Sequence, residues 1–97
     1  MPQIKRLILD VLKPHNPNMI ELSSRLSALK GVSGVNCILE EVDQETESIK
    51  IIIEGPSIDF EAVKKTIEQC NAVIHSVDGV AAGKKLVRDD VELVKVR

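Results

Sequence analysis

The strongest constraint on the fold of this chain is the order of its periodic segments, which alternates β-type stretches with two helix-type stretches. β-Branched and other aliphatic residues dominate 6–13, 35–43, 49–54 and 73–77, which is typical of strands. Two further segments repeat apolar residues every three or four positions, the spacing of helices that bury one face. The polar link at 43–47 is short, so the second and third strands are predicted to form an antiparallel hairpin.

Residues at the ends of both helical segments predict where the helices start and stop. Asn16 is a suitable N-cap, Pro17 suits the first turn, and Gly31 supplies a left-handed stop. Asp59 is the expected N-cap of the second helix, and Asn71 can end it. The apolar positions of the two helices are Met19, Leu22, Leu26 and Leu29, then Phe60, Val63, Ile67 and Cys70.

These segments predict one α+β domain over residues 1–97, in the order strand, helix, strand, strand, helix, strand. A four-stranded antiparallel sheet with both helices on one face buries both apolar stripes together. Right-handed crossovers favour the ferredoxin-like βαββαβ sandwich over other topologies. Residues 84–97 form an extended tail, in which 91–96 is a candidate for an extra strand.

Two helices cover one face of such a sheet and leave the other face open. Ile8, Leu12, Ile38 and Ile52 fall on the open side of the predicted strands. Apolar patches of this kind usually mark an interface, so the chain is predicted to form a homo-oligomer. The alternative is a monomer whose tail folds back over its own sheet.

Composition argues against several classes of partner. Thirteen basic and fifteen acidic residues leave a formal charge of -2, and Phe60 is the only aromatic residue. RNA-binding modules of this topology stack bases on sheet aromatics, so no nucleic-acid partner is expected. No segment resembles a signal peptide or a membrane span, which predicts a cytoplasmic protein without a membrane partner. Cys37 and Cys70 are then predicted to be buried small hydrophobes in a reducing compartment, with a disulfide or a soft-metal pair as the alternative.

Asp10 is the first candidate site residue, because a carboxylate in an apolar central strand is costly to bury unpaired. The fourth strand is expected beside the first, which brings His75 near Asp10, and Asp78 follows three residues later. In a straight strand His75 and Asp78 face opposite ways, so a joint site needs a β-bulge or a second subunit. The two interpretations are a metal or small-anion site at a subunit contact, and a structural pair of Asp10 with His75 or Arg6.

Two weaker candidates lie at the loops beyond the sheet. His15 precedes a helix N-terminus, where backbone N–H groups favour anions, although it can also simply rigidify its loop. Asp43, Glu45 and Glu47 in the hairpin supply oxygens for a divalent cation such as calcium. The hairpin lacks the spacing of a calcium loop, and a solvated acidic turn is the simpler interpretation.

No arrangement of nucleophile, base and orienting group is recognisable, so the chain is not expected to be an enzyme. The leading hypothesis is a non-enzymatic oligomeric module that binds a metal ion or small ligand between subunits. The alternative is an ACT-like regulatory domain that binds an amino acid or another small effector. Such domains usually place a glycine after the first strand, and Pro14 and Pro17 stand there instead.

Four collinear segments resemble the archaeal family of uncharacterised proteins called domain of unknown function 211. These segments are 9–15, 31–36, 43–47 and 75–83. The resemblance implies a ferredoxin-like fold that assembles into ring-shaped homo-oligomers, and it implies no activity. The candidate residues within these motifs are Asp10, His15, His75 and Asp78.

Overall fold

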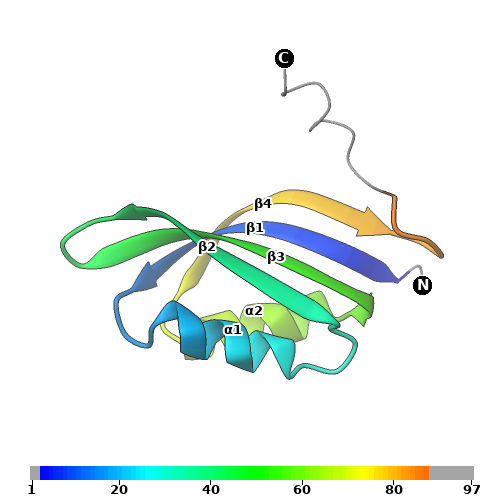
Figure 1. Cartoon of the computed structure of the whole chain (residues 1–97), viewed down its shortest axis with the longest axis horizontal. Coiled ribbons are helices and arrows are strands. Elements are labelled where there is room, and N and C mark those ends of the chain that lie inside the picture. The colour runs from blue at the N-terminus through cyan, green and yellow to red at the C-terminus, as the bar shows by residue number, and fades with distance from the viewer. Residues whose placement is uncertain (1–2, 88–97) are drawn as a thin grey trace, which may run out of the picture.

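The computed structural model describes residues 3–87 and contains the six elements in the predicted order (Figure 1). They are β1 (Ile4–Pro14), α1 (Met19–Ser27), β2 (Gly34–Val42), β3 (Thr46–Ile58), α2 (Phe60–Gln69) and β4 (Val73–Ala82). The strands form one sheet in the order β2-β3-β1-β4, with every neighbouring pair antiparallel. Both helices lie on the same side of this sheet in Figure 1. The expected α+β, ferredoxin-like βαββαβ fold is therefore confirmed.

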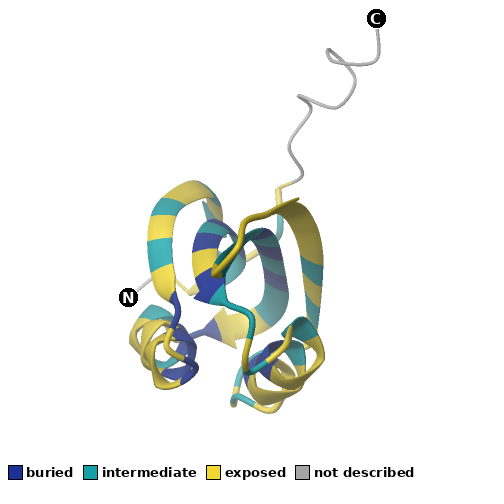
Figure 2. Cartoon of the chain, turned by 90° about the vertical axis from the view of Figure 1, so that its left-hand side faces the viewer, coloured by how far each residue is buried: buried dark blue, intermediate teal, exposed yellow. Residues whose placement is uncertain are grey.

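The core lies between the sheet and the two helices, because alternate residues of the central strands point towards the apolar helix faces. In Figure 2 the outward surfaces of both helices are exposed, while buried segments lie towards the sheet. The central strands contribute Leu7, Leu9, Val11, Ile49, Ile51 and Ile53, and the helices contribute Leu22, Leu26, Val63 and Ile67. Branched aliphatic side chains thus fill the core, as the composition requires.

The first helix begins two residues later than the sequence indicates, so the prediction of Asn16 as its N-cap is wrong. The cap is Asn18, whose side-chain oxygen accepts a hydrogen bond from the backbone N–H of Glu21 at 3.0 Å. The carbonyl of Pro17 is turned away from the helix, since it accepts a hydrogen bond from the Lys13 ammonium at 2.7 Å. Tertiary contact with the end of β1 therefore delays the helix start.

Both boundaries of the second helix follow the sequence closely. Asp59 caps α2 by accepting hydrogen bonds from the N–H groups of Glu61 and Ala62 at 3.0 and 3.3 Å. Asn71 follows α2 with a φ of 62°, and Gly31 follows α1 with a φ of 87°. Both conformations are left-handed, and Asn71 lies at the position where such a residue ends a helix. The first helix ends earlier than Gly31 predicts, because α1 stops at Ser27 with Ala28 as its right-handed cap, and Gly31 lies in the turn that follows.

The third and fourth strands are longer than predicted, because the 11-residue β1 offers pairing partners on both sides. β3 extends beyond the predicted 49–54, and β4 continues beyond 73–77 through Gly79 to Ala82. The described part of the tail, 84–87, is not a strand. The possible extra strand at 91–96 lies outside the described residues.

Candidate functional site

A β-bulge in β4 places His75 on the helix-free face of the sheet. Asp10 pairs with Ser76, but the next residue of β1, Val11, pairs with Ile74, so His75 is an extra residue in the ladder. Val11 and Ile74 face the helices, whereas Asp10 faces away from them. A bulge lets two successive residues point to one side, and His75 therefore lines the same hollow as Asp10.

A second β-bulge in β4 places Asp78 on the helix-free face of the sheet as well. Leu9 pairs with Val77 and Ile8 pairs with Gly79, which leaves Asp78 as the extra residue. The structure thus contains the bulges that a joint site requires, and His75 and Asp78 share one face. Strict alternation along β4 would have separated them.

Asp78 is already engaged by neighbours on this face. The Ser76 hydroxyl donates a hydrogen bond to Asp78 at 2.7 Å, and the Lys50 ammonium lies 3.4 Å from the other carboxylate oxygen. These contacts lower the pKa of Asp78, with the Ser76 hydrogen bond as the main cause. Lys50 also lies 4.0 Å from Glu40 on β2. A row of alternating charges therefore crosses the sheet from β2 to β4.

Asp10 and His75 lie on the same face as this charged row. Their side chains line a hollow of about 210 Å³ together with Val11, Leu12 and Ser48. Asp10 is half-buried and His75 is exposed. Lys50 lies opposite Asp10 in the pairing of β1 and β3, but its closest carboxylate is that of Asp78.

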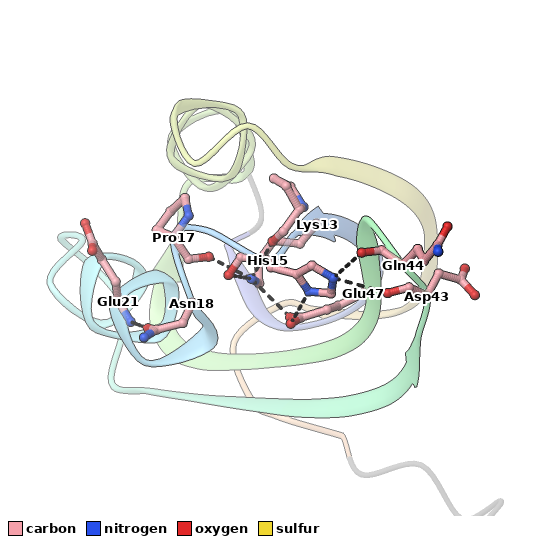
Figure 3. Close-up of polar contacts among 9 residues, drawn as sticks. Lys13, His15, Pro17, Asn18, Glu21, Asp43, Gln44 and Glu47 are labelled. Carbon is pink, nitrogen blue, oxygen red and sulfur yellow. Dashed lines mark hydrogen bonds and ion pairs between the residues drawn. The ribbon is translucent and has the colours of Figure 1, made fainter.

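At the end of β1, Lys13 forms a buried polar centre that the sequence analysis did not anticipate. Its side chain is fully buried, and its ammonium donates hydrogen bonds to the carbonyls of Pro14 and Pro17, each at 2.7 Å (Figure 3). The carboxylate of Glu47 on β3 completes the set at 3.1 Å. The signal was available in the pattern, because Lys13 continues the core-facing alternation of 7, 9 and 11.

His15 joins the same centre to the β2–β3 hairpin. Its Nδ1 lies 2.9 Å from Glu47 Oε2, and its Nε2 lies 3.1 and 3.0 Å from the carbonyls of Asp43 and Gln44 (Figure 3). All three partners accept hydrogen bonds, so the doubly protonated imidazolium fits best. The Glu47 hydrogen bond is the main cause that raises the pKa of His15, and His15 in turn lowers the pKa of Glu47.

This geometry favours the loop-rigidifying interpretation of His15. Its ring is held by the hairpin, and of the three weaker candidates Glu47 is committed to Lys13 and His15. Asp43 and Glu45 are exposed. Over residues 3–87, no three His, Cys, Asp or Glu side chains gather closely enough to hold a metal ion within one copy.

The contact of His15 with Glu47 predicts a pH-dependent stability. A raised His15 pKa contributes stability in full below the ordinary value of 6.5, and this contribution is lost as the pH rises through the folded-state pKa. Wild type should therefore melt above His15→Gln at about pH 5.5, with a smaller difference at about pH 8.5. Melting curves measured against pH test this, with His75→Gln as the matched loss of a histidine elsewhere. A His15→Gln difference that stays constant with pH would contradict the assignment.

Both cysteines are free thiols. Cys70 is buried in the core and Cys37 on β2 packs against the core. Burial raises the pKa of the Cys37 thiol to about 11, so the thiol is neutral at pH 7. Cys70 therefore fits the prediction of a small buried hydrophobe, whereas Cys37 is only half-buried. Neither described helix is long and apolar enough to span a bilayer.

Comparison with known proteins places the chain in a family. The family model described as DUF211, uncharacterised ArCR, matches residues 5–95. The chain belongs to the DUF211 family. It is 42% identical over 89 residues to the uncharacterised protein MJ0319 of Methanocaldococcus jannaschii, and the match covers 92% of each chain. The resemblance of the motifs to this archaeal family is therefore confirmed. Both the family and the relative from Methanocaldococcus jannaschii are described as uncharacterised.

Proposed function

We propose that this DUF211 chain is a non-catalytic module that associates with copies of itself through the sheet face opposite the helices. The exposure of aliphatic side chains on that face carries the proposal. Leu12 on β1 is 41% exposed, and Ile38 on β2 is 44% exposed. Ile8 and Ile52 pair with each other across the central strands and are half-buried. Contiguous apolar side chains on a surface mark interaction sites.

The charges on this face favour a second copy as the occupant. Lys50 lies between the carboxylates of Glu40 and Asp78, and Arg6 lies opposite Glu54 in the pairing of β1 with β3. Positive and negative groups are therefore intermingled. A two-fold axis can set such a face against its own copy with opposite charges facing each other. A partner of uniform charge, such as a nucleic acid, has no such match.

The size of the face also suits a second copy. Four strands spaced about 4.8 Å apart, each about ten residues long, cover of the order of 600 Å². Side chains that project from the sheet make the accessible area larger than this flat estimate. It then approaches the roughly 800 Å² that each partner contributes to a standard interface. A contact between two such faces is thus large enough for a stable pair.

A charge placed on this face should break the association. Ile38→Lys would bury unpaired ammonium groups at the contact, and we expect it to weaken self-association at least about 30-fold, the effect of an interface residue that contributes strongly to binding. Ile20→Lys is the matched control, because Ile20 is 75% exposed on α1. Native mass spectrometry should show assemblies for wild type and Ile20→Lys, and mostly the 10.7 kDa monomer for Ile38→Lys.

Three outcomes would contradict the proposal. The wild type could remain a monomer throughout the micromolar range, Ile38→Lys could leave the assembly intact, or Ile20→Lys could dissociate it equally well. The same spectra give the number of copies. A two-fold contact through one face closes at a dimer, so a ring, as the family resemblance implies, needs a second contact and would appear as one discrete mass above that of a dimer.

A further inference from the structure

We propose that a divalent ion of the zinc type binds where two copies meet, held by Asp10 and His75 of each copy. This inference rests on the proposed self-association, because the site is incomplete in one copy. It adds a ligand class and a stoichiometry: one ion for each pair of chains.

Asp10 and His75 are metal-ligating side chains on the face that no described neighbour engages. They line one hollow with Ser48 and Leu12, and within residues 3–87 neither side chain forms a hydrogen bond or an ion pair. The β-bulge at His75 in β4, opposite Asp10 and Val11, turns the imidazole towards this hollow. Bulges that re-aim a side chain are over-represented beside functional sites.

The other sequence candidates do not compete for this role. His15 is held by Glu47 and two carbonyls at the hairpin. Asp78 is held by Ser76 and Lys50. Lys50 lies opposite Asp10 in the pairing of β1 with β3, and its contacts with Asp78 and Glu40 offset its repulsion of a cation.

The donor set points to the kind of ion and to the need for a second copy. One carboxylate and one imidazole are half of the four ligands that zinc takes in a tetrahedral site. A two-fold axis through the hollow brings an equal pair from the second copy, giving two oxygens and two nitrogens. Calcium and magnesium prefer sites made of oxygen alone, whereas imidazole suits zinc, nickel and cobalt. The structure thus favours zinc-type ions over calcium, the cation suggested by the hairpin carboxylates.

Native mass spectrometry with added Zn²⁺ tests the stoichiometry, and the visible absorption of added Co²⁺ reports tetrahedral nitrogen and oxygen coordination. We expect one ion per two chains in the wild type. Outer-shell substitutions at metal sites already weaken binding about 10- to 100-fold, so Asp10→Asn and His75→Gln should each weaken it at least about 100-fold. His15→Gln is the matched control and should bind as the wild type does.

The outcomes separate this inference from the proposed function. An assembly that takes up no ion, takes one ion per chain, or keeps its affinity in Asp10→Asn and His75→Gln overturns the metal site and leaves the interface standing. Loss of binding in His15→Gln also overturns it. A chain that stays monomeric with and without Zn²⁺ overturns the interface and the metal site together.

Discussion

Replacing Lys13 by methionine should lower the free energy of unfolding by about 2–4 kcal/mol, as expected when a buried polar centre loses its cation. Methionine fills a similar volume, so packing is largely retained. The change removes the donor for the carbonyls of Pro14 and Pro17, both at 2.7 Å, and the ion pair with Glu47. These groups lie where β1, the start of α1 and the hairpin meet, and they would be left without their common partner.

Urea denaturation of wild type and Lys13→Met measures this loss. Lys5→Met is the matched control, because the Lys5 ammonium makes only exposed hydrogen bonds, to Pro56 and Gln3, and its removal should cost less than about 1 kcal/mol. Comparing Lys13→Met, Glu47→Gln and the double variant separates the ion pair from the carbonyl contacts, because the loss of the His15–Glu47 contact is common to both Glu47→Gln chains. An Lys13→Met chain as stable as Lys5→Met would show that the buried ammonium is not a stabilising centre.

Replacing Gly31 by alanine should cost about 3–5 kcal/mol, because it combines a strained backbone with a steric overlap. Gly31 has a φ of 87°, and an added Cβ would lie 1.9 Å from the carbonyl oxygen of Ser57. The two segments approach so closely because the Ser57 N–H donates a hydrogen bond to the Gly31 carbonyl at 3.3 Å. Gly55 belongs to the same joint, since its Cβ would lie 2.1 Å from the Gly31 oxygen.

Gly34→Ala is the control for this prediction. A Cβ at Gly34 has nothing within 4 Å, so the change should be neutral or stabilise by up to about 1 kcal/mol. The comparison requires only relative stabilities from urea denaturation, and an unfolded Gly31→Ala chain agrees with the prediction. Equal stability of the Gly31→Ala and Gly34→Ala chains would contradict it.

The order and pairing of the elements could be predicted because the responsible patterns are local. Apolar periodicity marks the strands and helices, and the cap at Asp59 and the stop at Asn71 are properties of single residues. The start of α1 could not be placed this way. It depends on a hydrogen bond from Lys13 to the Pro17 carbonyl, which forms only when the strand and the loop fold together.

The candidate site was predictable only in part, for the same reason. Strand adjacency placed Asp10 near His75, but the two bulges that turn His75 and Asp78 to one face arise from the pairing of β1 with β4. A prediction from strict alternation along a strand cannot place such an extra residue. Lys13 was missed because a lysine is ordinarily assigned to the surface, although its position in the alternation of β1 points inward.

The most direct test of the central claim is hydroxyl-radical footprinting of the wild type in dilute and concentrated solution, read out at Leu12, Ile38 and Ile20. All three side chains are exposed in the single chain. If copies meet through the helix-free face, the labelling of Leu12 and Ile38 falls as the concentration rises, while that of Ile20 on α1 stays constant. Labelling of Leu12 and Ile38 that is the same at every concentration would show that this face has no partner copy.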